Sequence, residues 1–175
     1  MSAPDLTEPV VAHLRSIHVV KTGALTMFDP MLSRVAAERD DPDTSDEVVD
    51  LLVRMHSAFS SHREETAEHV QRVGARLLEL HSSPANHRAS ALSFGARAWV
   101  AGSGIGGQNH GGNARNAFVF EHYEIASLKL LEQLAERHGD DETLGLARSC
   151  LAEDEAMAAT INRNWSNVLT LTLAG

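Results

Sequence analysis

Hydrophobic residues recur at intervals of three and four along most of the chain, which is the spacing of amphipathic helices. A first helix is predicted to begin at Thr7-Glu8-Pro9, where a capping-type residue precedes a proline in the first turn. Its hydrophobic positions continue to Phe28, and Asp29-Pro30 then predicts an end or a kink. A short helical continuation through Val35 is expected after the proline.

An acidic loop over residues 38–43 separates this helix from a second, longer one. Thr44 and Glu47 match a capping box, in which each side chain satisfies a backbone N–H of the first turn. The second helix is therefore predicted to begin at Thr44. Its hydrophobic stripe runs to a break at Ser82-Ser83-Pro84.

Residues 84–112 have an irregular pattern that ends in a glycine-rich stretch, which neither a helix nor a strand tolerates. We interpret them as a crossover connection. Asn113 is expected to cap a third helix, and Gly139 stands where a left-handed C-cap belongs. Asp140 or Asp141 is expected to cap a fourth helix, whose hydrophobic stripe runs through Val168.

These four helices predict an all-α protein, and a length of 175 residues fits one domain over residues 1–175. The loops within the first and the second pair of helices are short, so each pair is expected to form an antiparallel hairpin. Residues 84–112 are long enough to cross the bundle. The predicted fold is therefore an antiparallel four-helix bundle with a long crossover between the second and third helices.

Composition and charge exclude several classes of function. The chain has 15 Lys and Arg against 24 Asp and Glu, a net charge of −9, and its basic residues are scattered. Nucleic acid is therefore not expected as a partner. No uncharged apolar run approaches the roughly 20 residues of a membrane helix. The single cysteine, Cys150, and an N-terminus without the features of a signal peptide favour a cytoplasmic location.

Ionisable residues replace hydrophobic ones at similar depth in all four predicted helices. They are His18 and Lys21 in the first helix, His62, Glu65 and His69 in the second, Glu121 and Glu124 in the third, and Asp154 in the fourth. Burying an unpaired charge costs several kcal/mol, so these groups must satisfy one another or ligate something. Carboxylates and imidazoles on facing helices are how a bundle core holds iron, manganese or zinc.

The stripes predict how these groups are arranged. We expect one polar pocket at mid-bundle, formed by Glu65, His69, Glu121, Glu124 and Asp154, with His62 and Lys21 at its edge. Lys21 is expected to lie close to Glu65, Glu121 or Asp154 and to weaken or replace a metal ion, because its ammonium repels a divalent cation.

Two segments resemble the YciF-like stress-protein family of ferritin-like bundles. One is Phe59-Ser60-Ser61-His62-Arg63-Glu64-Glu65-Thr66-Ala67-Glu68-His69-Val70, and the other runs from Phe120 to Ala158 and includes Glu121-His122-Tyr123-Glu124. The resemblance extends from about Val11 to about Ile161. It implies a ferritin-like four-helix fold, a homodimer, an association with bacterial stress responses, and a di-metal site.

The sequence also departs from this family. Lys21 stands where the family carries an inward glutamate in its first helix, and Ala158 stands where it usually has a second acidic residue. The remaining candidate metal ligands are His62, Glu65, His69, Glu121, Glu124 and Asp154. These six groups can hold one metal ion, and two only with water or exogenous ligands.

Two functions remain open from the sequence. The first is a stress-associated ferritin-like protein with a mono-metal or di-metal site, whose activity, if it has one, would be a metal-dependent oxidation–reduction. The alternative is a metal-free helical bundle that acts as a structural or oligomeric interaction protein. Gly102, Gly104 and Gly107 match a dinucleotide-binding pattern, but no segment is predicted to form the parallel strands that this pattern requires.

Overall fold

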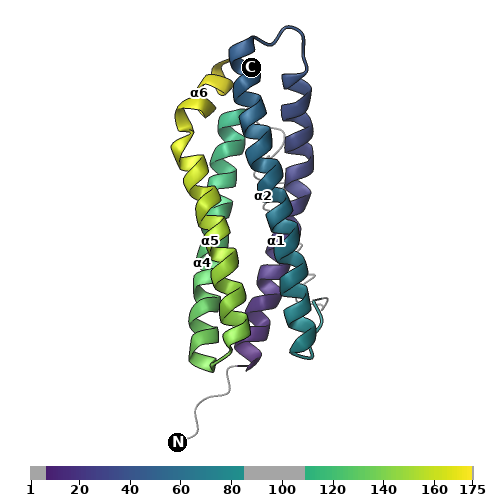
Figure 1. Cartoon of the computed structure of the whole chain (residues 1–175), viewed down its shortest axis with the longest axis vertical. Coiled ribbons are helices and arrows are strands. Elements are labelled where there is room, and N and C mark those ends of the chain that lie inside the picture. Colours follow the sequence, from purple (N-terminus) through teal and green to yellow (C-terminus); the bar gives the residue numbers. More distant parts are fainter. Residues whose placement is uncertain (1–6, 85–108, 175) are drawn as a thin grey trace, which may run out of the picture.

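The computed structural model describes residues 7–84 and 109–174, and the described residues form helices and turns without a strand. The helices are α1 (Thr7–Arg39), α2 (Asp46–Glu79), α4 (His110–His138), α5 (Asp141–Arg163) and α6 (Trp165–Ala174). The four long helices lie along one axis, and α6 continues from α5 at the end where α1 turns into α2 (Figure 1). The predicted all-α bundle is confirmed.

The helices pair as the loop lengths predicted. α1 packs mainly against α2, and α4 packs mainly against α5. α1 also contacts α4, and α2 contacts both α5 and α6, which closes the bundle. Most of the expected crossover, including the glycine pattern at 102–107, lies outside the described residues. No described helix is long and apolar enough to cross a membrane.

The start of α4 differs from the prediction, because Asn109 and not Asn113 caps the helix. The Asn109 side chain accepts a hydrogen bond of 2.9 Å from the backbone N–H of Gly112. Gly111 lies in this first turn, where a Cβ atom would come within 3.0 Å of the Thr172 hydroxyl. Gly111 and Gly112 therefore belong to the first turn of α4, and the absence of a Cβ atom at Gly111 allows the close approach of this turn to α6.

The two ends of the α1–α2 turn also differ from the prediction. α1 continues through Pro30 to Arg39, because Phe28, Met31 and Val35 are buried on either side of the proline and hold the helix in place. The predicted capping box is wrong: Ser45 is the N-cap of α2, and the Thr44 hydroxyl donates to the Glu38 carbonyl oxygen at 2.7 Å.

The α4–α5 turn follows the prediction. Gly139 adopts a left-handed conformation with φ 73°, and Asp140 accepts a hydrogen bond of 2.9 Å from the Thr143 backbone N–H. The fourth predicted helix is divided, however, because Asn164 interrupts it between α5 and α6. The Asn164 side chain donates to the Thr160 carbonyl oxygen at 2.8 Å, so it provides a hydrogen bond for one of the last carbonyl groups of α5.

The hydrophobic core consists of two main clusters with a polar layer between them. One cluster is centred on residues such as Leu14, Val73, Leu77, Leu128 and Leu131, and the other on Phe28, Phe59, Phe120, Met157 and Ile161. The buried residues of this layer on α2, α4 and α5 lie between the positions that contribute to the two clusters; they are His62, His69, Glu121, Glu124 and Asp154. Lys21 of α1 is buried beside Val20, which belongs to the second cluster. The fold therefore surrounds one polar layer with hydrophobic packing on both sides.

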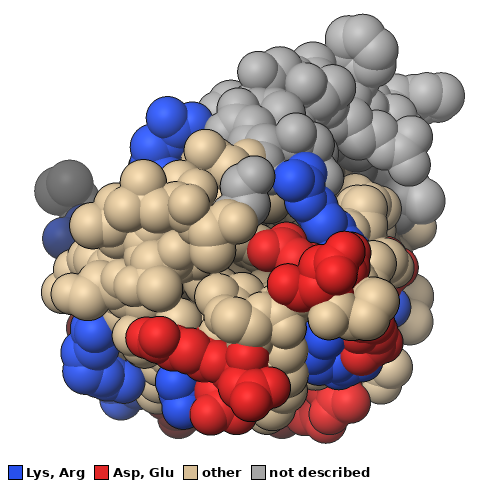
Figure 2. Space-filling model, turned by 90° about the horizontal axis from the view of Figure 1, so that it is seen from above, with Lys and Arg blue, Asp and Glu red and all other residues tan. Residues whose placement is uncertain are grey.

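The surface at the α6 end carries both signs of charge. Viewed along the bundle axis from this end, acidic and basic residues lie interspersed around a large uncharged area (Figure 2). α6 itself contributes no charged residue. The described residues of this face therefore show no continuous basic surface of the kind that phosphate backbones require.

Candidate metal centre

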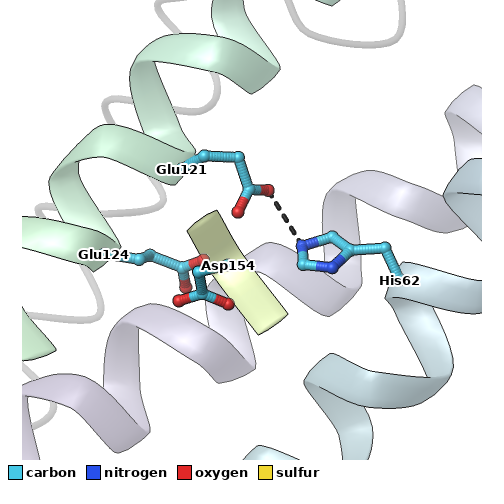
Figure 3. A group of neighbouring side chains, drawn as sticks. All are labelled: His62, Glu121, Glu124 and Asp154. Atoms are coloured by element: carbon cyan, nitrogen blue, oxygen red, sulfur yellow. Dashed lines mark hydrogen bonds and ion pairs between the residues drawn. The ribbon is translucent and has the colours of Figure 1, made fainter. Parts of the chain in front are cut away.

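Four buried side chains converge in the polar layer. They are His62 from α2, Glu121 and Glu124 from α4, and Asp154 from α5, and one ligand atom of each lies within 4.8 Å of the others. Figure 3 shows these side chains pointing toward a common region between the three helices. Each residue is at most 3% exposed, so the cluster is shielded from bulk water.

The helical register places both glutamates in this cluster. Glu121 and Glu124 are one turn apart, so they share the inner face of α4 that Leu128 and Leu131 continue. Phe120 and Leu128, on either side of the pair, belong to the two hydrophobic clusters. The surrounding packing therefore fixes both carboxyl groups inside the bundle.

His62 is held by carboxylates on both ring nitrogens. Its Nε2 lies 2.9 Å from Glu121 Oε1, and its Nδ1 lies 3.1 Å from Glu65 Oε2. Burial opposes the charged imidazolium, but the hydrogen bond and the charge of Glu121 raise the pKa of His62 to about 9. In the protein without a metal, the His62 ring is therefore positively charged at neutral pH and is one of two cations in the layer.

Lys21 is the other cation, and it lies inside the cluster. Its Nζ donates to Asp154 Oδ1 at 2.7 Å, to Asp154 Oδ2 at 2.6 Å and to Glu124 Oε2 at 3.1 Å. Burial disfavours the ammonium, but the charges of Glu124 and Asp154 raise the pKa of Lys21 above its ordinary value. The lysine is therefore charged, although it is only 1% exposed.

In the described part of the polar layer, the pKa of one carboxyl group is strongly raised, and two carboxylate oxygens lack a hydrogen-bond partner. Burial raises the pKa of Glu124 to about 8, against the opposing attraction of Lys21. Glu124 Oε1 and Glu121 Oε2 are buried and have no hydrogen-bond partner in the described part of the chain. Buried polar atoms are nearly always satisfied in proteins, so these two oxygens indicate a missing proton, water or cation.

Two predicted ligands lie outside the four-residue cluster. Glu65 contacts His62, but its side chain is 40% exposed at the edge of the layer. His69 is fully buried, with its Nε2 2.7 Å from Glu153 Oε2 and its Nδ1 3.8 Å from Asp154 Oδ1. Burial, and then the charge of Lys21, lower the pKa of His69 to about 4, so its ring is neutral.

The expected centre and edge of the pocket are therefore exchanged. His62 and Lys21 were expected at the edge and lie at the centre, whereas Glu65 was expected at the centre and lies at the edge. The helical spacing of α2 could have predicted the positions of His62 and Glu65, because Phe59, His62 and Thr66 share one line of the helix. Glu65 is one residue off that line. Lys21 contacts Asp154, one of its three expected neighbours, and also Glu124, which was not among them.

Glu153 is a polar partner that the sequence pattern did not single out. It lies one residue before Asp154 on α5 and is 34% exposed, yet it accepts the hydrogen bond of the buried His69. A contact between α2 and α5 at this point could not be read from the stripe of either helix, because it depends on their relative rotation. Glu153 therefore acts through His69 and not on the cluster directly.

The donor atoms of the cluster fit a metal ion. One imidazole nitrogen and three carboxylates form a set that iron, manganese and zinc accept in proteins. The two unsatisfied oxygens, one each on Glu121 and Glu124, are the buried atoms that a divalent cation would complete. Glu65 would then orient His62 through its other ring nitrogen, as outer carboxylates do for metal-ligating histidines.

Comparison with known proteins supports the fold and the family. A structure described as "YcfI, a putative structural protein from Rhodopseudomonas palustris" matches with a TM-score of 0.65 and 19% identity, and the match covers 92% of this chain and 95% of that one. No curated protein matches the sequence. The profile of the family described as "Domain of unknown function (DUF892)" matches residues 46–174, which is most of the chain. The chain therefore belongs to the DUF892 family.

Proposed function

We propose that the protein is a metal-binding helical bundle in which His62, Glu121, Glu124 and Asp154 hold one divalent cation, either iron, manganese or zinc. The observation that carries this proposal is the convergence of four buried ligands from three helices, two of them with unsatisfied oxygens. Three buried carboxylates repel one another, and a divalent cation relieves that repulsion more fully than one proton does.

The chemistry of the site follows from the ion it holds. A bound iron or manganese ion would supply redox chemistry, and zinc would supply only Lewis acidity. The chain's own residues position the ligands: Glu65 orients the His62 ring, and the two hydrophobic clusters exclude water on both sides. The resemblance to YciF-like proteins supports a role in bacterial stress responses and a homodimeric assembly as parts of the same proposal.

A second candidate function rests on Lys21. Its ammonium already pairs with Asp154 and Glu124, so the layer contains a permanent cation supplied by the chain. A metal-free bundle with a structural or oligomeric role would need only this pairing and the His62–Glu121 contact. The description of the Rhodopseudomonas palustris neighbour as a structural protein agrees with this alternative.

Metal binding to chelator-treated protein separates the two functions. We expect isothermal titration with Mn²⁺, Zn²⁺ or, without oxygen, Fe²⁺ to show one ion per chain. Glu121→Gln keeps the shape of the side chain but removes its charge, so it should weaken binding at least tenfold. Glu136→Gln, on the same helix but exposed, is the matched control and should bind like the parent. A parent that binds none of the three ions at millimolar concentration would establish the metal-free alternative.

A further inference from the structure

Carboxylate oxygens surround the ammonium group of Lys21. Three oxygens, both of Asp154 and one of Glu124, lie 2.6 to 3.1 Å from its Nζ. Its side chain comes from α1, which among the long helices of the described residues is the one that contributes no ligand to the four-residue cluster. The ammonium therefore stands beside the candidate metal position and shares two of its ligands, Glu124 and Asp154.

His69 lies beside Asp154, the carboxylate that this ammonium contacts with both oxygens. Its Nε2 lies 2.7 Å from Glu153 Oε2, and a carboxylate at that distance requires Nε2 to carry the proton and donate it. The other nitrogen, Nδ1, then bears a free lone pair. Nδ1 is buried, lacks a hydrogen-bond partner in the described residues, and lies 3.8 Å from Asp154 Oδ1.

This arrangement of His69 is typical of a metal-ligating histidine. Such a histidine donates from one ring nitrogen to a carboxylate, which fixes the tautomer and directs the lone pair of the other nitrogen at the ion. His69 has the carboxylate, the tautomer and the free lone pair, but the Asp154 carboxylate beside its Nδ1 is paired with the Lys21 ammonium. An ammonium can donate to the lone pair, yet its hydrogen bonds go to Asp154 and Glu124 instead.

We infer that the Lys21 ammonium fills a second cation position, formed by His69 Nδ1, Asp154 and Glu124, and thereby limits the cluster to one metal ion. This inference rests on the proposed function for the first ion but concerns a different position. Two divalent ions and an ammonium cannot share Glu124 and Asp154, because the repulsion between the cations exceeds the attraction of two carboxylates. A neutral side chain at residue 21 would leave the second position with three ligands and a deficit of positive charge.

The test is the number of metal ions that each variant binds. Lys21→Met removes the charge and keeps much of the length of the side chain, and Lys21→Gln provides a second variant that can still donate a hydrogen bond to Asp154. Chelator-treated parent and variants are titrated with Zn²⁺ and with Mn²⁺, and bound metal is counted by elemental analysis. Lys129→Met, which removes an exposed lysine paired with Glu155, is the matched control.

We expect one ion per chain for the parent and for Lys129→Met, and two for Lys21→Met and Lys21→Gln. Adding His69→Phe to Lys21→Met should return the number to one. The ¹⁵N resonance of His69 Nδ1 provides a separate readout, because Zn²⁺ should shift it in Lys21→Met and leave it nearly unchanged in the parent.

The outcomes distinguish this inference from the proposed function. A parent without metal and a Lys21→Met variant with one ion at His69 would support the second position and overturn metal binding by the native chain. One ion in both proteins, with no shift of His69 Nδ1, would overturn the second position and leave the proposed function standing. No ion in the parent or in either variant would overturn both.

Discussion

The Nζ of Lys21 lies 2.6 Å from Oδ2 of Asp154, and neither side chain is more than 1% exposed. A buried ion pair gains little over well-packed hydrophobic residues, but removal of one partner leaves the other charged and desolvated. The stability of the metal-free protein is therefore expected to depend on this pair far more than on any ion pair at the surface.

Asp154→Asn should destabilise the metal-free protein by about 3–5 kcal/mol, because Lys21 would retain only the carboxyl group of Glu124, whose pKa is raised to about 8, within hydrogen-bond distance. The measurement is urea unfolding in the presence of a chelator. Glu155→Gln is the control on the same helix, since Glu155 pairs with Lys129 at the surface and such pairs contribute at most about 1 kcal/mol. Equal unfolding midpoints for the two variants would contradict the prediction.

Lys21→Glu should be destabilised without metal and stabilised by added Mn²⁺, Fe²⁺ or Zn²⁺ more strongly than the parent. The substitution places a fourth carboxylate beside Glu121, Glu124 and Asp154, and only protonation or a cation relieves their repulsion. A ligand that binds only the folded state raises the melting temperature by mass action. Thermal melts of parent and variant, with and without each metal, measure this effect, and equal metal responses would show that Lys21 does not control the site.

The stability of the metal-free protein should fall as the pH rises from about 6.5 to 9. Glu121 and Glu65 hold the pKa of His62 at about 9 in the folded state, and an unfolded histidine titrates near 6.5. The folded state therefore binds more protons in this interval, so the stabilisation by His62 is complete below pH 6.5 and lost through pH 9. Glu124, with a pKa of about 8, changes stability in the same direction.

Chemical unfolding at pH 6.5, 8 and 9 in a chelator measures this slope. His62→Gln should flatten it, and His122→Gln, on an exposed position of α4, is the control that should retain the slope of the parent. A parent whose stability increases over the interval would show that His62 is neutral in the folded protein.

The proposed homodimer is expected to use the outer face of α4. Val119, Tyr123 and Leu130 are 51%, 55% and 52% exposed, on the side of the helix opposite Glu121 and Glu124. These three residues form a stripe along α4 together with Ala126-Ser127 at its centre and the partly buried Leu134 at its end. The intervals between these positions are the same in both directions along the helix. Such a stripe is self-complementary for two antiparallel helices related by a twofold axis.

Tyr123→Glu should shift the protein from dimer to monomer, because it places a charge near the centre of each copy of this stripe. Analytical ultracentrifugation measures the change, and Gln71→Glu, on an exposed position of α2, is the control that should remain dimeric. A monomeric parent, or a Tyr123→Glu variant that remains a dimer, would rule out this surface.

The local elements could be predicted where neighbouring residues decide them. The three- and four-residue spacing located all four long helices, and Gly139 and Asp140 marked the α4–α5 turn because a left-handed C-cap and an N-cap depend only on adjacent backbone. The start of α4 could not be predicted from its glycines. A Cβ atom at Gly111 would come within 3.0 Å of the hydroxyl of Thr172, which is distant in the sequence, so the need for glycine at this position follows from tertiary packing.

The sequence by itself determined that ionisable groups would lie at one depth in four helices, because helical periodicity fixes which residues share a face. Only the tertiary structure decided which of them meet. The rotation of each helix, set by hydrophobic packing above and below the layer, brings His62 and Lys21 to the centre, leaves Glu65 at the edge, and gives His69 a partner in Glu153. A shift of one residue along a helix rotates a side chain by about 100°, which is enough to move it from the cluster to the surface.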